Sequence, residues 1–325
     1  MRPSDESGYR AGVSERMSRL DDLAAAVDHL QTGGKATRAR CVQLVGEAFG
    51  VEPTDARIAS FSHAVELLHL GTLIHDDILD AAEQRRGRSS VHVEYGAKVA
   101  VLAGDVAVSR SGCMIADLGS IRLCRKFAAV LAELCEGELL QDDQRWNPDL
   151  TMPAYLGRLA RKTGGLFELA CEGAAVIAGA GNQAADRAGR FGRDLGCLFQ
   201  MVDDLLDTTR DSAALGKPAG RDLEAGCLTL EVVLALEDPG NGSALRSRIA
   251  ASPSGDSSDL ARWLTAPRLQ ERTRQILDLM GQMTLEGLGG FPRNPASVQL
   301  AILVEGLLAT GQRALSAGLE PLAAG

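Results

Sequence analysis

Two short segments of the chain carry aspartates at the same spacing. They are the Asp-Asp-x-x-Asp clusters Asp76, Asp77 and Asp80, and Asp203, Asp204 and Asp207. Residues four apart share one face of an α-helix, where like charges cost about 0.2–0.5 kcal/mol per pair. Carboxylate oxygens are what hard cations prefer, and Mg²⁺ takes one or two carboxylates together with water and substrate phosphates. We therefore expect two facing helices that hold Mg²⁺, with Mn²⁺ as a substitute, against a diphosphate. A solvated acidic face is the alternative for either cluster alone.

Basic and polar residues near these clusters fit the same chemistry, because a diphosphate needs cations around it. Arg85 and Arg86 follow the first cluster, and Gly87 is expected to cap its helix. Lys35 and Arg38 open a helix after two glycines, where amide groups and cations favour phosphate. The further candidates are His69, two turns before Asp76, Lys162 and Thr163 at a Lys-Thr-Gly-Gly break in a helix, Gln200 in the second acidic stripe, and Lys217 in a loop.

Composition bounds the remaining possibilities. The chain has 325 residues, 45% of them hydrophobic and only 4% aromatic, and a net charge of −9. An acidic chain disfavours nucleic acid as a partner. Seven scattered cysteines without a Cys-x-x-Cys pair fit reduced thiols in a cytoplasmic protein. With no signal peptide and no apolar run of 18 residues, we expect no transmembrane segment.

The hydrophobic pattern is helical almost throughout, which predicts an all-α fold. Helices are expected at about 14–31, 35–49, 54–84, 96–118, 122–144, 151–179, 184–210, 225–236, 267–286 and 296–317. Residues 1–14 are expected to be flexible, and the Gly-, Pro- and Ser-rich residues 238–256 are expected to form a surface loop. The whole chain, 1–325, is expected to be one domain.

At this point the residues resemble a known family, the trans-isoprenyl (polyprenyl) diphosphate synthases. The matching segments are GGKATRAR (33–40), HLGTLIHDDILDAAEQRRGRSS (69–90), VLAGD (101–105), EGELLQ (136–141), RKTGGLF (161–167) and FQMVDDLLDTTRDSAALGKPAGRDLEAGCLTL (199–230). The resemblance as a whole runs from about residue 15 to residue 236. The resemblance implies a single bundle of mostly antiparallel helices around a deep central cavity. It also implies a homodimer.

The resemblance also assigns roles. It implies that the six aspartates bind Mg²⁺ on an allylic diphosphate, with Asp76, Asp77, Asp80, Lys162, Asp203 and Asp204 catalytic. It implies that Arg85, Lys162, Thr163, Gln200 and Lys217 contact that diphosphate. Lys35, Arg38, His69, Arg86 and Phe199 would hold isopentenyl diphosphate. Loss of the allylic diphosphate then leaves a cation that the isopentenyl double bond attacks, in a cavity that excludes water.

The sequence departs from the family pattern at three positions. Cys227 stands where the family has Lys in its E-G-K-x-T-L-P segment, Glu231 stands where it has Pro, and Ala36 replaces an Arg. A weakly active or non-catalytic subunit of a heteromeric synthase is therefore the alternative. A class I terpene cyclase is disfavoured by the second Asp cluster, and a helical scaffold protein is the remaining reading.

Product length in the family depends on side chains just before the first Asp motif. Gly71 and Thr72 stand there, and Ala107 and Ser111 on the next long helix are also small. Small side chains would leave a deep cavity open. The resemblance thus predicts a product of C20 (geranylgeranyl) or longer.

Overall fold

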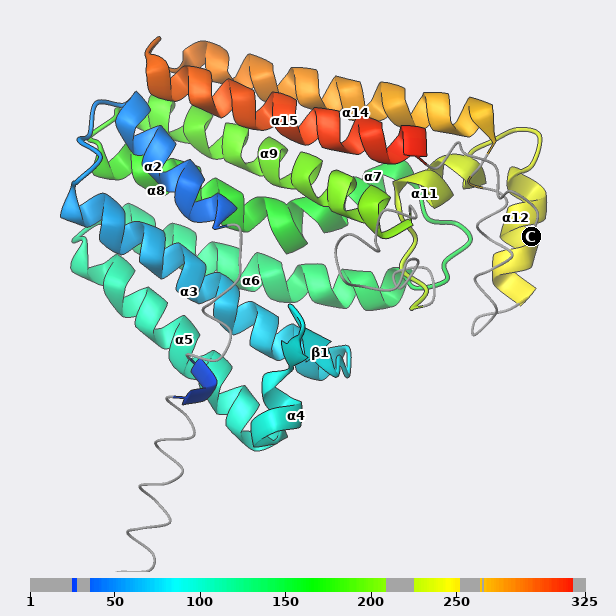
Figure 1. The fold of residues 1–325 in the computed structure, drawn as a ribbon, viewed down its shortest axis with the longest axis horizontal. Helices are drawn as coiled ribbons and strands as arrows, with labels where there is room; N and C mark the ends of the chain where they lie inside the picture. The colour runs from blue at the N-terminus through cyan, green and yellow to red at the C-terminus, as the bar shows by residue number, and fades with distance from the viewer. Residues whose placement is uncertain (1–24, 28–35, 209–224, 252–263, 265, 318–325) are drawn as a thin grey trace, which may run out of the picture. The chain divides into compact units, whose positions relative to one another are not determined.

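The computed structural model describes residues 25–27, 36–208, 225–251, 264 and 266–317. Lys35, Lys217 and the N-terminal segment expected to be flexible lie outside these residues. The elements are α2 (Thr37–Ala48), α3 (Ala56–Leu79), β1 (Gln84–Arg85), β2 (Arg88–Ser89), α4 (Val91–Tyr95), α5 (Ala97–Asp117), α6 (Ile121–Gln144), α7 (Met152–Leu159), the π-helix η1 (Ala160–Gly164), α8 (Gly165–Ile177), α9 (Asn182–Thr208), α11 (Leu230–Leu236), α12 (Gly242–Ala251), α14 (Pro267–Gly287), the 3₁₀-helix η3 (Leu288–Gly290) and α15 (Pro295–Ala317) (Figure 1). The prediction of an all-α fold is confirmed.

The chain divides into two compact units. Unit 1 contains Met1–Ala39 and Ser60–Ser120, and unit 2 contains Arg40–Ala59 and Ile121–Gly325. The first Asp cluster belongs to unit 1 and the second to unit 2. The single domain expected over 1–325 stays a prediction.

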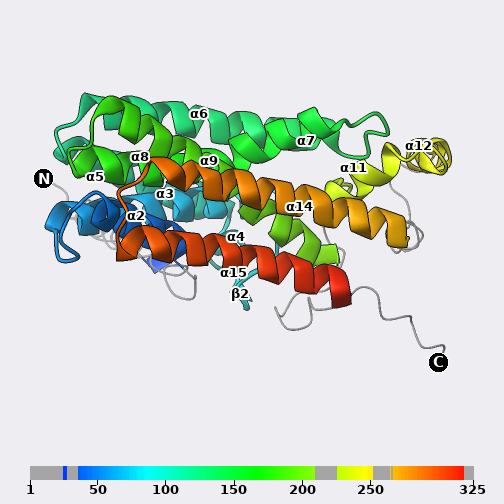
Figure 2. The same ribbon diagram turned by 90° about the horizontal axis from the view of Figure 1, so that it is seen from above.

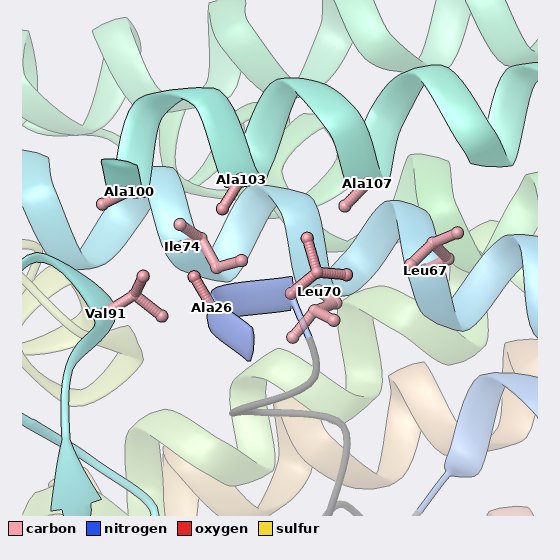
Figure 3. Close-up of a cluster of buried hydrophobic side chains, with 9 residues drawn as sticks. Ala26, Leu67, Leu70, Ile74, Val91, Ala100, Ala103 and Ala107 are labelled. Carbon is pink, nitrogen blue, oxygen red and sulfur yellow. The ribbon is translucent and has the colours of Figure 1, made fainter. Parts of the chain in front are cut away.

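The core of unit 1 is built on close contact between α3 and α5. Figure 3 shows Ala100, Ala103 and Ala107, one helical turn apart on α5, turned towards Ile74 and Leu70 of α3. All five side chains are buried, because alanines at this spacing let two helices approach closely.

Two small residues predicted to leave a cavity open are used in this contact instead. Ala107 is fully buried, and a Cβ added at Gly71 would lie 3.3 Å from the Ala107 Cβ and 2.9 Å from Val108 Cγ2. Ser111 is also fully buried, and its hydroxyl donates to the Ala64 carbonyl at 2.7 Å. Their small size therefore has a packing reason, and the expectation that they keep a tunnel open is wrong for Ala107 and Ser111.

Helix α5 also bears on the membrane prediction. Within the described residues it is the one helix that is long and apolar enough to cross a bilayer by length and composition alone, whereas the sequence analysis expected none. One such helix is weak evidence of a membrane span, and α5 contributes three alanines to the core of unit 1.

The core of unit 2 is centred on α9. Its neighbours include α8, α14, α15 and η1, and Figure 2 shows α14 and α15 running side by side. Gly192 permits the contact with α8, because a Cβ there would lie 2.4 Å from the Phe167 carbonyl oxygen and 2.9 Å from Cys171 Cβ. Gly196 permits a similar contact with η1, because a Cβ added there would lie 2.8 Å from Gly164 Cα. The break expected at Lys-Thr-Gly-Gly is present as the π-helix, a feature often found at functional sites.

Four local predictions were wrong, and two of them concern the residues that follow α3. The helix expected over 54–84 ends at Leu79, and the next residues form a hairpin in which Arg85 pairs with Arg88. Its two-residue turn, Arg86-Gly87, has φ of 54° and 75°, as a type I′ turn requires, so Gly87 is a turn residue and not a helix cap.

The other two concern the C-terminal half. Residues 238–256 are not all loop, since α12 forms where alanine, leucine and arginine, all good helix formers, follow the Asp-Pro-Gly-Asn turn. The helix expected from residue 225 begins at Leu230, because Gly226 adopts φ of 78° in a turn.

The tight α8–α9 contact generates a stability prediction. Gly192→Ala should destabilise the chain by about 1–3 kcal/mol, since the methyl group would overlap a backbone oxygen. Gly306→Ala in α15 is the matched control: nothing lies within 4 Å of its added Cβ, and alanine should stabilise that helix by up to about 1 kcal/mol. Urea unfolding of both variants measures the difference, and equal effects would contradict the packing assigned to Gly192.

Candidate functional site

In each Asp cluster the second aspartate is buried, and the first and last have more access to solvent. Asp77 is fully buried and Asp204 is 5% exposed. By contrast, Asp80 and Asp203 are exposed, and Asp76 and Asp207 are partly buried. Residues i and i+4 share a helix face, whereas residue i+1 turns about 100° away. Each cluster therefore combines a carboxylate pair open to solvent with one carboxylate inside the protein.

The buried carboxylate of unit 1 is held by the hairpin. Arg85 Nε donates to Asp77 Oδ1 at 2.7 Å, and Arg85 Nη2 lies 2.5 Å from the same oxygen. The other oxygen, Asp77 Oδ2, has no hydrogen-bond partner among the described residues. Arg85 was predicted to contact a diphosphate, but here its guanidinium links the hairpin to the end of α3.

Cations gather around His69 in unit 1. Burial lowers the pKa of the partly buried His69 well below its ordinary value, and the charges of Arg38, Arg86 and Arg85 lower it further. These three arginines come from α2 and from the hairpin, and all three lie within electrostatic range of His69 on α3. The structure thus brings together four of the residues predicted to bind diphosphates.

Contacts of His75 within unit 1 account for the glycine in the VLAGD segment (101–105). His75, which precedes the first Asp cluster, lies with its Nε2 3.1 Å from the Val101 carbonyl oxygen and 3.7 Å from Asp105 Oδ1. A Cβ at Gly104 would lie 2.1 Å from the same nitrogen. Glycine at this position therefore lets the imidazole reach α5 beside the end of α3.

The buried carboxylate of unit 2 lies at the centre of a hydrogen-bond relay. Asp204 accepts hydrogen bonds from the Tyr155 hydroxyl at 2.8 Å and from Gln200 Nε2 at 2.9 Å. Gln200 Oε1 accepts one from Thr163 at 2.7 Å. Burial raises the pKa of Asp204 to about 6, although both donors and the nearby Arg158 lower it. The relay joins α7, the π-helix and α9 at the second Asp cluster.

Lys162 lies on the π-helix next to this relay. Its ammonium donates to Gln141 Oε1 at 2.9 Å and lies 2.8 Å from Glu138 Oε2. Both partners belong to the EGELLQ segment of α6. The contacts assign a task to that segment: in this state it holds the lysine predicted to contact the diphosphate.

Sequence reasoning missed two residues of this region, Tyr155 and Arg158. Tyr155 is fully buried, and Arg158, 4% exposed, lies over its ring at 5.3 Å and donates to the Leu228 carbonyl at 2.8 Å. No sequence signal marks them beyond their place on the helix that leads into Lys162.

The remaining predicted residues are placed as follows. Phe199 is partly buried and its ring packs on Phe167, with centroids 5.5 Å apart. Thr72 is partly buried, and its hydroxyl donates to the His69 carbonyl at 2.9 Å. Gly71 is buried against α5, as described above.

Comparison with known proteins decides the family. The family model described as "Polyprenyl synthetase" matches residues 21–265, most of both units. The chain belongs to the polyprenyl synthetase family. It is accordingly a transferase, a prenyltransferase of isoprenoid biosynthesis.

Relatives of this polyprenyl synthetase include enzymes and solved structures. "Heptaprenyl diphosphate synthase component 2" of Geobacillus stearothermophilus is 35% identical over 276 residues, 84% of each chain. The crystal structure of a decaprenyl diphosphate synthase from Rhodobacter capsulatus is 26% identical, with TM-score 0.78, over 91% of this chain and 97% of that one. A polyprenyl synthase from Caulobacter crescentus, complexed with calcium and isoprenyl diphosphate, is 25% identical, with TM-score 0.77, over 94% and 96%.

The family is metal-dependent, and its substrates are an allylic diphosphate and isopentenyl diphosphate. In the described residues no three His, Cys, Asp or Glu side chains are grouped so that they could hold a metal by themselves. That fits Mg²⁺ bound with a diphosphate, because one or two carboxylates suffice when phosphates and water complete its six ligands. The solvent-accessible aspartates of each cluster carry donors of this type.

The Arg85–Asp77 pair generates a stability prediction. Arg85→Ala should destabilise the chain by about 3 kcal/mol, because it leaves a buried carboxylate without its cation. The control Arg88→Ala, an exposed residue of the same hairpin, should cost less than about 1 kcal/mol. Thermal unfolding distinguishes them, and similar losses would refute the anchoring role of Arg85.

His69 generates a pH prediction. Its pKa is lowered in the folded chain, so below about pH 6.5 the unfolded chain binds a proton that the folded chain does not. The folded chain is therefore destabilised relative to neutral pH as the pH falls below about 6.5. His69→Gln should remove this part of the pH dependence, as measured by urea midpoints. The control His63→Gln, exposed on the same helix, should follow the wild-type curve.

Proposed function

We propose that this polyprenyl synthetase condenses an allylic diphosphate with isopentenyl diphosphate, head to tail, to give an all-trans polyprenyl diphosphate. The observation that carries the proposal is the repeated arrangement of the Asp clusters: an accessible carboxylate pair beside a buried, hydrogen-bonded aspartate. Asp76 and Asp80, and Asp203 and Asp207, are the proposed ligands of Mg²⁺, for which Mn²⁺ substitutes. Asp77 and Asp204 are assigned to hold these pairs in place.

The residues around the clusters have separate tasks in this proposal. Arg38, His69 and Arg86 bind isopentenyl diphosphate, since they form the cationic group of unit 1, and Lys35 and Phe199 join them by family resemblance. Lys162, Thr163 and Gln200 bind the allylic diphosphate, together with Arg85 and Lys217. Mg²⁺ held by the accessible aspartates would withdraw charge from the departing diphosphate. The neutral His69 donates or accepts a hydrogen bond without adding charge.

The reaction balances without a side-chain base. The allylic carbon–oxygen bond breaks, and the electron pair leaves with the diphosphate. The isopentenyl double bond forms the new carbon–carbon bond, and the proton lost from the adjacent carbon goes to the released diphosphate. The central cavity that the family resemblance implies would protect the cation from water.

The product is proposed to be C20 or longer. The printed names of the relatives, heptaprenyl, decaprenyl and solanesyl diphosphate synthases, support this length. Gly71 does not support it, because its smallness is explained by packing against α5. Thr72 remains the proposed chain-length residue. We also propose a cytoplasmic location and a homodimer, whose interface would cover the exposed Ile121 and Leu139 of α6.

A second function, subunit of a heteromeric synthase, is favoured by one observation. The Geobacillus relative is named as a component, "component 2". Robust turnover by the lone polypeptide with Mg²⁺ would eliminate this function. Activity only after a second polypeptide is added would establish it, and sedimentation of the same samples would distinguish a homodimer from a mixed assembly.

The metal assignment is tested by replacing one accessible carboxylate in each cluster. Asp76→Ala and Asp203→Ala should each lower kcat/KM by about 100-fold or more, because Mg²⁺ loses a ligand. Asp117→Asn, an exposed residue at the end of α5, is the control and should retain wild-type activity. Full activity of either alanine variant would remove that cluster from the metal site.

Product length is tested by chromatography after incubation with labelled isopentenyl diphosphate and C5, C10, C15 or C20 primers. We expect products of C20 and longer. If farnesyl diphosphate and isopentenyl diphosphate gave nothing beyond C15, the proposed product length would be wrong. Products from the C5 and C10 primers would then decide whether the chain catalyses the condensation.

A further inference from the structure

Residues 225–231, which include two of the three departures from the family pattern, contact other parts of unit 2. Gly226, with φ of 78°, lies under Trp146, and its carbonyl accepts a hydrogen bond from the Trp146 amide at 3.0 Å. Arg158 donates to the Leu228 carbonyl at 2.8 Å. The segment that ends at Glu231 is thus fixed against α7 and the end of α6.

Glu231 is buried, with 6% exposure, in the first turn of α11. Burial raises the pKa of its carboxyl group to about 7, so the ionised form is unfavourable there. Proline, the family residue, would be compatible with this position, because the first amides of a helix need no partner within it. A buried carboxyl group lowers the stability of the folded chain unless hydrogen bonds compensate for its loss of water. The hydrogen bonds of Glu231 therefore need an account.

Its contact is with the last turn of α9. The Thr208 hydroxyl lies 2.7 Å from Glu231 Oε2, 3.1 Å from the Leu205 carbonyl and 3.4 Å from the Asp204 carbonyl. A hydroxyl donates only one proton, and a threonine that bonds back to its own helix bends it. The acceptor on α11 therefore competes with the helix carbonyls for this proton.

We propose that Glu231 is a positioning residue, which acts through Thr208 to fix the last turn of α9 and with it the carboxylates of Asp203 and Asp207 for the divalent cation. Thr208 directly follows Asp207, so a change in the direction of this turn moves that carboxylate first. The inference rests on the proposed function, because it assigns metal binding to the second Asp cluster.

The test distinguishes two properties of the side chain at position 231, its hydrogen-bond acceptor and its negative charge. Glu231→Gln keeps an acceptor for Thr208, whereas Glu231→Pro removes it; Thr208→Ser and Thr208→Val form the matching pair on α9. Glu237→Gln, exposed just after α11, is the control. Circular dichroism of each full-length variant checks the fold, and the conservative variants keep the test valid if Pro or Val impairs folding.

Two readouts are needed. Binding of Mn²⁺ with inorganic pyrophosphate, followed by electron paramagnetic resonance, requires no turnover. The Mg²⁺ dependence of kcat and the KM for isopentenyl diphosphate are measured on the same samples. Glu231→Pro and Thr208→Val should weaken Mn²⁺ binding by about tenfold, the size typical of residues that orient metal ligands. Their double variant should be no worse than either alone. Glu231→Gln, Thr208→Ser and the control should stay within about twofold of wild type, with the KM for isopentenyl diphosphate unchanged.

The outcomes separate this inference from the proposed function. If wild type binds Mn²⁺ and turns over, but Glu231→Pro and Thr208→Val only lower the melting temperature, Glu231 is structural and the inference is overturned. If Glu231→Gln binds Mn²⁺ as weakly as Glu231→Pro does, the charge of Glu231 and not its hydrogen bond with Thr208 supports metal binding. That result overturns the inference. Wild type that binds no Mn²⁺ with pyrophosphate overturns the metal assignment and the inference together. Wild type that binds it without turnover overturns only the proposed condensation.

Discussion

One aspartate of each Asp cluster is inside the protein, and the arrangement of both units at their candidate sites depends on how that carboxylate is paired. A carboxylate inside a protein is costly unless hydrogen bonds or an opposite charge stabilise it. In unit 1 the partner is the guanidinium of Arg85, and in unit 2 the partners are Tyr155 and Gln200. The two units solve the same problem with different chemistry, a charge pair and a pair of neutral donors.

These different partners have different electrostatic consequences. In unit 1 burial lowers the pKa of His69 well below its ordinary value, and the charges of Arg38 and of the two hairpin arginines lower it further. In unit 2 burial raises the pKa of Asp204 to about 6. A bound divalent cation would favour the ionised carboxylate and oppose that effect.

Small residues determine how closely the helices that carry the clusters approach their neighbours. Gly104 and the alanines of α5 admit the side chains of α3, and Gly192 brings α9 against α8. Such contacts do not bind substrate, but they fix the height and rotation of each helix. The π-helix adds a residue to the turn that carries Lys162 and Thr163, and both side chains reach partners on other helices.

The sequence by itself determined the helical fold, both Asp clusters and the family, because helical periodicity and motif spacing are local properties of the chain. It also located the break at Lys162-Thr163, since paired glycines are unfavourable inside a helix. Tertiary structure alone decided which aspartate of each cluster is buried, since burial depends on the neighbours. It likewise decided that Arg85 lies in a hairpin and pairs with Asp77, that Gly71 and Ala107 serve packing, and that Tyr155, Arg158 and Glu231 belong near the second cluster. Those contacts join residues far apart in the sequence, and no local pattern encodes which distant side chain will satisfy a buried charge.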